Sequence, residues 1–522
     1  MIVNTLSELL HYSAGRWPER VAVADAAGGR ALTYRNLDAL VTDLTAQLNR
    51  HGVGKGDSVA IASDNCLEYV LALFAVVGVR ASAAPLNPAL TAPQVASTLS
   101  NLRPRATIVP AHLHDESVTT HGNAAGEVWE LSLAPGQHGD MRAELDASQT
   151  SADGSIRAGI PRLDPPLADD VAILLLTSGT TAAPKVVPLT HGNLLASIDG
   201  IRTAYRLTPD DATLLVMPLY HGHGLIAGLL ATLASGGAGY LPTGGRFHAG
   251  SFWSDMVTAR ATWYTAVPTI HQILLARAGS DYPRDGYPDL RFVRSCSAAL
   301  APAVLQDLEA AFSAPVLSAY GMTETAHQVS SNPLPSDGVD KPASVGLATG
   351  VDIRVTGPGG GPAGSGETGE VWIRGPAVTS GYLDNPAATA ESFTGDWFHT
   401  GDLGHLDSDG YLFLTGRIKE TINRGGEKIS PSMVDEVLQS NPDVEDAVSF
   451  AVPDEKYGEE IEAAVVLRPG HTVGEDELKQ YARSKLSAFE VPKRIFFMAD
   501  LPRTAKGAGD RRRLASLLGR RN

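Results

Sequence analysis

Short apolar runs alternate with helical patterns along most of the chain. Residues 57–62 and 106–109 are mainly apolar and typical of buried strands. Residues 65–79, which lie between them, carry apolar side chains at the spacing of a helix. An alternation of buried strands and helices favours parallel sheets that are covered by helices. The pattern therefore predicts an α/β fold for this part of the chain.

The pattern changes after residue 419. Ser430 is a capping residue followed by proline at the first helical position, which predicts a helix over residues 430–440. Strand-like runs at residues 447–452 and 463–467 come next, and a helical pattern over residues 475–486 follows them. The last part of the chain is therefore predicted to be a small α+β unit.

The chain is too long for a single core. With 522 residues it should divide into at least two domains. The change of pattern places a large domain at residues 1–417 and a small one at residues 418–522. Residues 146–169, rich in Ser, Ala, Gly and Pro, are expected to form a mobile connection. Residues 357–364 are also glycine-rich, but a proline-broken run between strand-like segments favours a hairpin turn over a phosphate cradle.

Composition narrows the location and the partners. The net charge of -16 argues against nucleic acid as the main partner, although the C-terminal tail is basic. Cys66 and Cys296 show neither metal-type spacing nor a disulfide framework, which suggests a reducing compartment. The first residues lack the regions of a signal peptide, and no apolar run is long enough to span a membrane. We therefore expect a cytoplasmic protein that binds neither a membrane nor nucleic acid.

A run rich in hydroxyls and glycine follows the apolar residues 171–176 directly. Polyphosphates require many donors at close range, and such a run after a buried strand can supply them. The run differs from the G-x-x-x-x-G-K-[ST] pattern, because a proline precedes its lysine and no Ser or Thr follows it. Taken by itself, it is explained equally well by an ordinary surface turn. The candidate phosphate-binding residues are Thr177, Ser178, Gly179, Thr180, Thr181 and Lys185.

This run resembles the signature loop of the adenylate-forming superfamily, which contains acyl-CoA synthetases, luciferases and peptide-synthetase adenylation domains. The resemblance extends from about Thr33 to Arg512, nearly the whole chain. It implies a large N-terminal domain of parallel-type sheets sandwiched by helices, and a small mobile α+β lid with a hinge near Lys419. Six further motifs follow in the family's order: MPLYH at residues 217–221, YGMTE at 320–324, GETGE at 366–370, TGD at 400–402, GRIK at 416–419 and NRGGEKI at 423–429.

The resemblance assigns roles around ATP or an acyl-adenylate. The phosphate-binding residues would hold the β- and γ-phosphates, and Thr323 would donate to the α-phosphate. Glu324 would carry Mg2+, a hard cation that prefers oxygen ligands. Asp402 would accept hydrogen bonds from the ribose hydroxyls, and Arg417 would reach the ribose or phosphate edge. Outside this context, a helix cap would be the favoured explanation of a lone Thr-Glu pair. Further nucleotide or CoA contacts fall on Gly321, Met322, Lys419 and Gly425.

The adenine ring is expected to lie beside small residues. Ser297, Ala298 and Ala299 occupy the place where the family packs small side chains along the base. Tyr320 would stack on the face of the ring. The alternative for the three small residues is plain core packing.

A histidine and two glycines mark the acyl and thiol side. His221 matches the family's gating histidine beside the acyl carboxylate, although an isolated histidine is more often structural. Gly425 and Gly426 match the lid segment along which pantetheine threads, where backbone without side chains is required. Because no carrier domain follows the lid, CoA is the expected acceptor. The implied reaction turns a carboxylic acid into an acyl-adenylate and then into acyl-CoA, as an acid–thiol ligase does.

The lid departs from the family at one catalytic position. The family places a lysine there that stabilises the transition state of adenylation, and this chain has Ala508. Lys506 lies two residues earlier, on the same face of an extended strand, and offers a substitute. Two residues of the signature loop also differ from the family. Ala182 stands where Ser or Gly is usual, and Val186 stands where Gly is usual, so the loop is expected to be less flexible.

Ala508 has two explanations. It is an engineered change in a full ATP-dependent acyl-CoA synthetase, or it is native to an enzyme that mainly forms the thioester. Such an enzyme takes acyl-adenylate from a separate adenylating enzyme. A rival from another class is a pseudoenzyme that binds nucleotide or acyl-CoA without turnover. Against this alternative, the chain retains more of the family's site residues than passive binding requires, namely Glu324, Asp402, His221 and Gly426. Dimers are common in the family, so a homodimer is a further expectation.

The acid substrate is open between two classes. Residues 263–271 and 323–333 resemble oxalyl-CoA synthetases, and a dicarboxylate would need a cation such as His271, Arg294 or His327. The alternative is a bulky acid in a wide apolar pocket opened by small residues, namely Gly222, Gly224, Gly228 and Ala298.

Overall fold

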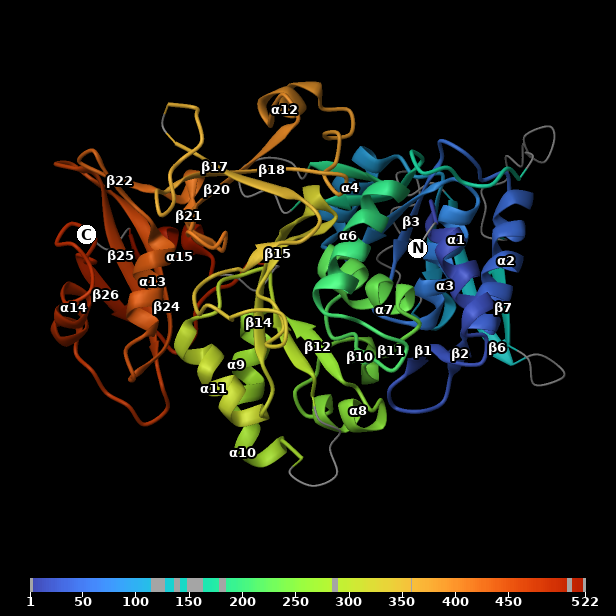
Figure 1. Cartoon of the computed structure of the whole chain (residues 1–522), viewed down its shortest axis with the longest axis horizontal. Coiled ribbons are helices and arrows are strands. Elements are labelled where there is room, and N and C mark those ends of the chain that lie inside the picture. The colour runs from blue at the N-terminus through green and yellow to red at the C-terminus, as the bar shows by residue number, and fades with distance from the viewer. Residues whose placement is uncertain are drawn as a thin grey trace.

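The strands of the chain form four sheets. The computed structural model describes residues 3–113, 127–135, 141–147, 163–177, 185–283, 290–357, 359–504 and 509–519, and the four sheets lie within them. Figure 1 shows the N-terminal elements, drawn in blue and green, on one side of the molecule and the C-terminal elements, drawn in orange and red, on the other.

One sheet is mainly parallel and has the order β7-β6-β5-β3-β4-β8-β9. Strands β7 and β9 pair antiparallel at its two edges. The strands predicted at residues 57–62 and 106–109 are β3 and β5, so the predicted alternation is confirmed here. The strands of this sheet are β3 (Ser58–Ala62), β4 (Ser82–Leu86), β5 (Ala106–Pro110), β6 (Glu127–Pro135), β7 (Met141–Asp146), β8 (Val171–Leu176) and β9 (Val186–Thr190).

A second sheet has the order β16-β15-β14-β13-β12-β10-β11-β1-β2. Its central strands β14, β13, β12, β10, β11 and β1 run parallel, and antiparallel pairs close both edges. The strands are β1 (Val21–Asp25), β2 (Ala31–Thr33), β10 (Ala212–Leu214), β11 (Ala238–Leu241), β12 (Trp263–Ala266), β13 (Phe292–Ser295), β14 (Val316–Met322), β15 (His327–Ser331) and β16 (Leu347–Ala348).

Helix α3 (Leu67–Gly78) lies between these two sheets. It contacts β3, β4 and β5 of one sheet and β1 of the other. Residues 67–77 are all buried, as expected for a helix that is apolar on nearly every face. The helix thereby joins both sheets into one hydrophobic core. The other helices of this part are α1 (Leu6–Arg16), α2 (Tyr34–Arg50), α4 (Ala92–Leu102), α6 (His191–Ala204), the π-helix η2 (His223–Leu230), α7 (Ala231–Ala234), α8 (Phe252–Thr258), α9 (Pro268–Ala276), α10 (Ala278–Asp281) and α11 (Pro302–Phe312).

A third, antiparallel sheet follows, with the order β17-β18-β20-β19 and β21 paired to β20. The glycine-rich residues 357–364 connect the paired strands β17 and β18, so the predicted hairpin turn is confirmed for the described part of that run. The elements are β17 (Asp352–Thr356), β18 (Gly369–Arg374), α12 (Pro386–Glu391), β19 (Phe393–Thr394), β20 (Trp397–Leu406) and β21 (Leu412–Arg417).

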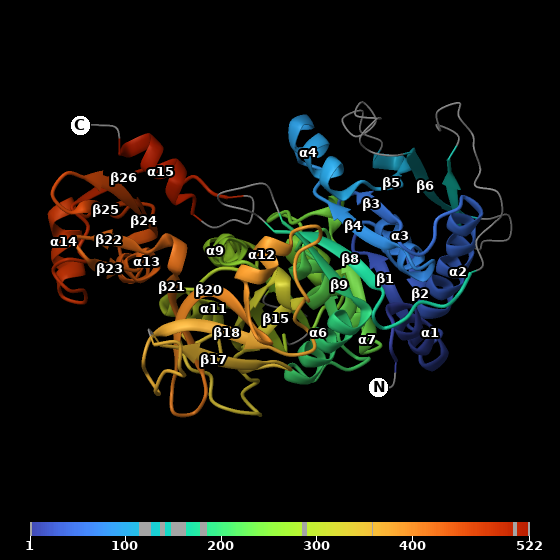
Figure 2. The ribbon, with the colours of Figure 1, turned by 90° about the horizontal axis from the view of Figure 1, so that it is seen from above.

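The C-terminal elements form a fourth sheet with its own core. Figure 2 shows them grouped at one end of the molecule, with β21 beside α13. The helix predicted at residues 430–440 is α13, whereas the helix predicted at 475–486 is α14 and ends earlier, at Arg483. The boundary at residue 417 and the hinge near Lys419 stay predictions. The elements are β22 (Ile422–Arg424), β23 (Glu427–Ile429), α13 (Pro431–Gln439), β24 (Val444–Asp454), β25 (Gly458–Leu467), α14 (Glu475–Arg483), β26 (Arg494–Phe497) and α15 (Arg511–Leu518).

None of the described helices combines the length and the apolar character that a membrane span requires.

Candidate active site

The two ends of the candidate phosphate loop pair with each other. The Thr177 backbone amide donates to the Lys185 carbonyl over 2.9 Å, and the Lys185 amide donates to Thr177 Oγ1 over 3.2 Å. These bonds extend the antiparallel pairing of β8 and β9, so the loop closes a β-hairpin whose ends are fixed. The other candidate residues of the loop, Ser178, Gly179, Thr180 and Thr181, lie outside the described residues, as does Ala182.

Lys185, Tyr382 and Glu324 form what we call the phosphate cluster. The Lys185 Nζ lies 4.1 Å from the centre of the Tyr382 ring, and the Tyr382 hydroxyl donates to Glu324 Oε1 over 2.9 Å. Backbone bonds support this arrangement, because the Leu383 amide donates to the Val186 carbonyl over 2.9 Å. Tyr382 was not among the residues predicted from the sequence. Its partner Glu324 is 58 positions away along the chain, and no local pattern points to that contact.

Glu324 contributes a buried carboxylate to the phosphate cluster. It lies in the short 3-10 helix η4 (Thr323–Thr325) and is 8 % exposed. Within the described part of the chain no lysine or arginine forms an ion pair with it, so its buried charge lacks a counter-charge. Burial and the Glu324 charge raise the pKa of Tyr382, whose hydroxyl therefore stays a donor. The predicted role of Glu324 as a Mg2+ ligand fits this carboxylate.

Tyr320, Asp402 and Arg417 form the ribose cluster. Asp402 is 5 % exposed, and its Oδ1 lies 2.9 Å from the Nε of Arg417, while the Tyr320 hydroxyl donates to Oδ2. Burial raises the pKa of the Asp402 carboxyl, and Arg417 and Tyr320 act in the opposite direction. A carboxylate has about four acceptor positions, so two hydroxyl donors can still be accepted beside these partners. The geometry is compatible with the predicted contact to a ribose.

A tight backbone contact places the turn between these clusters. A Cβ on Gly321 would lie 1.6 Å from the carbonyl oxygen of His327, so only glycine fits there. Ala326 and His327 follow with φ of 48° and 89°, conformations that side chains other than glycine rarely adopt. The turn that carries Thr323 and Glu324 is therefore strained, as is common at functional sites.

Arg294 lies at the centre of what we call the acyl network. Its side chain is 0 % exposed, on strand β13, and it forms no ion pair with any residue that the structure describes. A guanidinium has five N–H donors, and here all of them have an acceptor other than a carboxylate. The acceptors are the hydroxyl of Tyr205 at 2.8 Å, Thr265 Oγ1 at 3.0 Å, His223 Nε2 at 3.2 Å, His327 Nε2 at 3.0 Å and Gln328 Oε1 at 2.9 Å.

His223 connects Arg294 to an exposed serine. Its Nε2 lies 2.6 Å from Thr265 Oγ1 and faces the Arg294 donor, so this nitrogen is the acceptor of the ring. Nδ1 then carries the proton and donates to Ser297 Oγ over 3.0 Å. Burial, helped by positive neighbours, lowers the pKa of His223 well below its ordinary value, so the ring is neutral. The hydroxyl proton of Ser297 is left free to donate to a bound anion.

The residues expected beside adenine are accessible. Ser297, Ala298 and Ala299 are all exposed and follow β13, so the alternative of plain core packing is wrong. The backbone of Ser297 has a φ of 74°, a left-handed conformation that residues other than glycine rarely adopt.

Two expectations about the acid pocket need correction. His271 is fully buried beneath Tyr264, and burial lowers its pKa to about 4, so it supplies no cation near neutral pH. A Cβ on Gly224 would lie 2.4 Å from the carbonyl oxygens of Met217 and Pro218, and one on Gly228 would lie 3.0 Å from a Leu215 methyl. These two glycines let η2 pack on the preceding segment and do not widen a pocket.

Asn65 holds the segment that ends at the half-buried His221. Its side chain donates to the carbonyls of Leu215 and Met217 over 2.7 and 3.0 Å, and it accepts from the amide of Leu219 over 2.9 Å. Tyr69 adds a hydrogen bond to the carbonyl of Leu219 over 2.7 Å. The start of α3 thereby fixes the backbone of the MPLYH motif.

Gly425 and Gly426, which the sequence assigns to the lid, form hydrogen bonds with residues outside these clusters. The Gly425 amide donates to the Tyr457 carbonyl over 2.8 Å, and the Gly426 amide donates to Asn423 Oδ1 over 3.1 Å. Both glycines have positive φ, and a Cβ on Gly426 would meet no atom within 4 Å. Lys419 is exposed in η5 (Ile418–Glu420), and Lys506 and Ala508 lie outside the described residues.

Comparison with known proteins identifies relatives along the whole chain. Residues 10–383 match the model of the AMP-binding enzyme family, and residues 433–508 match the model of the AMP-binding enzyme C-terminal domain. The chain is 46 % identical to the oxalate–CoA ligase of Arabidopsis thaliana, over 98 % of each chain. It is 38 % identical to the oxalate–CoA ligase of Saccharomyces cerevisiae, over 95 % of this chain and 94 % of the relative. The fold is similar to that of ATP-bound MatB from Rhodopseudomonas palustris, with a TM-score of 0.86, 29 % identity and coverage of 98 % and 99 %.

Replacement of Tyr382 by Phe should weaken Mg2+-dependent nucleotide binding. The variant keeps the ring under Lys185 but removes the donor to Glu324, and loss of such an orienting bond typically costs 10- to 100-fold in metal affinity. Calorimetric titration of an ATP analogue at varied Mg2+ concentration measures this. Tyr411→Phe is the matched control, because Tyr411 also carries a lysine on its ring and donates to one acceptor, Val339. An unchanged Mg2+ requirement in Tyr382→Phe would contradict the role.

Replacement of Asp402 by Ala should weaken AMP binding by roughly 10- to 100-fold, since hydrogen bonds to a charged acceptor contribute about 1.5 to 3 kcal/mol. Equilibrium binding of AMP measures the change. Asp396→Ala serves as the control, because Asp396 also pairs with an arginine, Arg374, but in an exposed position. Equal affinities of the two variants would remove Asp402 from the ribose site.

Proposed function

The chain belongs to the AMP-binding enzyme family and is an acyl-CoA ligase, and we propose that its acid substrate is a small dicarboxylate. The ligase reaction has two steps and uses ATP and CoA. In the first, a carboxylate oxygen attacks the α-phosphorus of ATP and pyrophosphate leaves. In the second, the sulfur of CoA attacks the acyl carbon, AMP leaves, and the thiol proton passes to solvent or to a base.

The observation that carries the substrate proposal is the buried charge of Arg294. A cation in the interior without a carboxylate partner is costly, and an anionic ligand nearby offsets part of that cost. His223 relays the orientation of Arg294 to Ser297, whose free hydroxyl proton can donate to a carboxylate, and this proposed role replaces the predicted place of Ser297 beside adenine. A second carboxylate of the substrate would gain from both effects, whereas a plain apolar acid would gain from neither. The names of two relatives, both oxalate–CoA ligases, support a small diacid.

The other clusters contribute to positioning and charge in this proposal. Lys185 would hold the terminal phosphates, and the carboxylate of Asp402 would accept the ribose hydroxyls. Glu324 would hold Mg2+, which when bound neutralises phosphate charge as pyrophosphate departs. His221, on the segment fixed by Asn65, would stand beside the acyl carbonyl. Electrostatic positioning of this kind is the main source of rate in phosphoryl and nucleotidyl transfer.

The first step is proposed to be slow in this chain. Ala508 replaces the lysine that the family uses to stabilise the transition state of adenylation, and one preorganised donor is worth roughly 100- to 1000-fold in rate. Thioester formation uses the other face of the lid and would not need that lysine. The chain would then act mainly on acyl-adenylate, with a separate adenylating enzyme as its source.

Oxalate should bind the protein in the presence of a non-hydrolysable ATP analogue at least tenfold more tightly than acetate, because only oxalate has a second carboxylate. Ser297→Ala should reduce this preference to about threefold or less, since one hydrogen bond to a charged group is lost. Calorimetry with both acids measures the preference without any need for turnover. Ser313→Ala is the matched control, because Ser313 is also an exposed serine with positive φ, of 52°. A preference that is absent in the unmodified chain would sink the dicarboxylate proposal.

The unmodified chain should form acyl-CoA from a synthetic acyl-adenylate and CoA, yet show little acid-dependent exchange of pyrophosphate into ATP. Ala508→Lys should raise that exchange by roughly 100- to 1000-fold and leave thioester formation nearly unchanged. Lys506→Ala, made in both backgrounds, tests whether Lys506 substitutes. Ordinary exchange rates in the unmodified chain would contradict the half-reaction proposal, and absence of the thioester would contradict ligase activity itself.

A further inference from the structure

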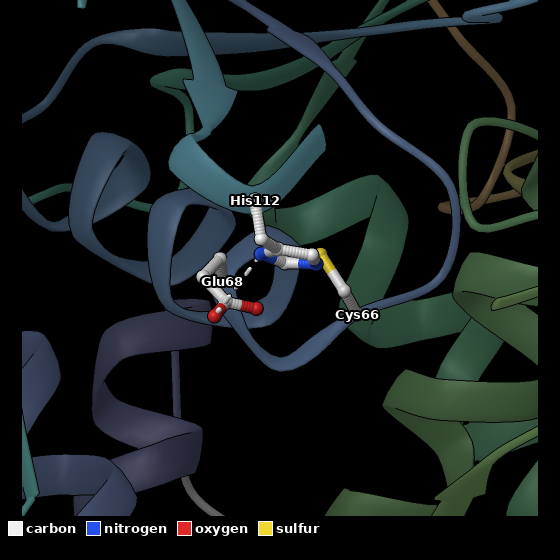
Figure 3. Close-up of side chains that lie close together, drawn as sticks. All are labelled: Cys66, Glu68 and His112. Atoms are coloured by element: carbon white, nitrogen blue, oxygen red, sulfur yellow. Dashed lines mark ion pairs between the residues drawn. The ribbon is translucent and has the colours of Figure 1, made fainter. Parts of the chain in front are cut away.

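A cluster of three metal-ligand side chains lies at the start of helix α3. Cys66 is the N-cap of that helix, Glu68 lies in its first turn, and His112 belongs to the 3-10 helix η1 (Ala111–Leu113). Their candidate ligand atoms all lie within 4.8 Å of one another. Figure 3 shows the His112 ring beside both the Glu68 carboxylate and the Cys66 sulfur. None of these residues takes part in the phosphate cluster, the ribose cluster or the acyl network.

Sheet topology brings the three residues together. Strands β3 and β5 are parallel neighbours, so their carboxyl ends meet at the same edge of the sheet. Cys66 and Glu68 follow β3, and His112 follows β5. Carboxyl ends of parallel strands are the usual place for binding sites in such sheets.

Glu68 has an unsatisfied oxygen within this cluster. The residue is 2 % exposed; its Oε1 accepts from Arg30 and lies 3.7 Å from Nδ1 of His112. Its Oε2 is buried and has no hydrogen-bond partner among the described residues. Arg30 also pairs with Asp25 over 3.1 Å, so one guanidinium faces two carboxylates. A negative charge is left over, and a buried carboxylate oxygen without a partner is costly unless a cation occupies the site.

The sulfur of Cys66 is placed to become a thiolate ligand. Cys66 is the N-cap of α3, a helix of 12 residues, where the helix dipole favours a negative charge. Burial and the neighbouring Glu68 carboxylate nevertheless raise the pKa of the thiol to about 12, so a metal ion must displace the thiol proton. Its Sγ accepts from the Tyr69 amide over 3.4 Å and lies 3.1 Å from Ser63 Oγ. The His112 side chain is 47 % exposed, so this one of the three ligands faces solvent.

We infer that Cys66, Glu68 and His112 bind one divalent transition-metal ion of the zinc class. Thiolate, imidazole and carboxylate together are the ligand set that zinc prefers, with water as a fourth ligand. Tetrahedral zinc with bonds of about 2.0 to 2.3 Å places ligand atoms about 3.3 to 3.8 Å apart, so the 3.7 Å between His112 and Glu68 needs little change. On binding, the Cys66 thiol gives its proton to solvent and the sulfur bonds to the metal. Arg30 would orient the carboxylate as an outer partner.

The site adjoins residues that position the active site. Asn65, the neighbour of Cys66, and Tyr69, one turn further, hold the backbone of Leu215, Met217 and Leu219. An ion that fixes the first turn of α3 would therefore restrain the segment that ends at His221. The structure assigns the metal a positioning role and not a catalytic one, since it lies outside the three clusters around the substrates.

Titration of the full-length, chelator-treated protein with Co2+ in excess Mg2+ tests the inference. Co2+ bound to a thiolate shows a sulfur-to-metal charge-transfer absorption that oxygen and nitrogen ligands do not give, and Mg2+ blocks binding at carboxylate sites. We expect one equivalent of Co2+ with this absorption and its displacement by Zn2+. Cys66→Ser should abolish the absorption. His112→Ala should weaken Co2+ binding at least tenfold, because even the loss of a residue that only orients a metal ligand typically costs 10- to 100-fold in affinity.

Cys296→Ser is the matched control, because Cys296 is the other buried free cysteine. It should leave both the absorption and the affinity unchanged. Far-UV circular dichroism checks that each variant is folded, and Glu68→Gln, which keeps the shape of the side chain, should also weaken binding at least tenfold. An absorption that survives in Cys66→Ser, or the lack of any Co2+ binding at tens of micromolar, overturns the inference. Either result leaves the ligase proposal untouched, because the readout is spectroscopic.

Discussion

The contact between Gly321 and the carbonyl oxygen of His327 is the constraint on which the rest of the site depends. No side chain fits between them, so the turn from β14 to β15 has a single tight course. Tyr320 leaves this turn toward the ribose cluster, Glu324 toward the phosphate cluster, and His327 toward the acyl network. Positive φ at Ala326 and His327 costs on the order of 1 to 3 kcal/mol each, which the surrounding packing must offset. One strained turn thereby fixes the three clusters relative to one another.

Whether a feature could be predicted from the sequence depended on how far apart along the chain its interacting residues lie. The strands β3 and β5, helix α13 and the motif positions of Glu324 and Asp402 were predictable because periodicity, caps and short motifs act locally. Tyr382 and the partners of Arg294 depend on contacts across 29 to 89 positions, which no local pattern encodes. Gly224 illustrates the same limit. Its small size was visible in the sequence, but which atoms face its missing Cβ is a property of the fold alone.

Arg294 and Glu68 are buried charges that have no opposite charge of their own among the described residues, and a proposal rests on each of them. Every N–H donor of Arg294 has an acceptor, but none of these acceptors is a carboxylate. The hydrogen bonds of Arg294 are therefore satisfied, whereas its positive charge is not balanced. Glu68 carries the opposite charge. Its partner Arg30 is shared with Asp25, and its Oε2 has no hydrogen-bond partner in the described structure. Hydrogen bonds alone do not neutralise a buried charge. An anion beside Arg294 and a cation beside Glu68 are therefore the ligands that we propose for these two positions.

The described residues on either side of residues 505–508 are held by ion pairs and close packing. Arg503 pairs with Asp446 before residues 505–508, and Gly509 pairs with Arg503 after them. Arg511 then lies 2.7 Å from Asp435 and 3.3 Å from Glu420, next to the proposed hinge. A Cβ at Gly509 would lie 2.3 Å from a Val448 methyl, so the chain passes close to β24 at this point. Ion pairs and close packing therefore anchor the chain where it enters residues 505–508 and where it leaves them.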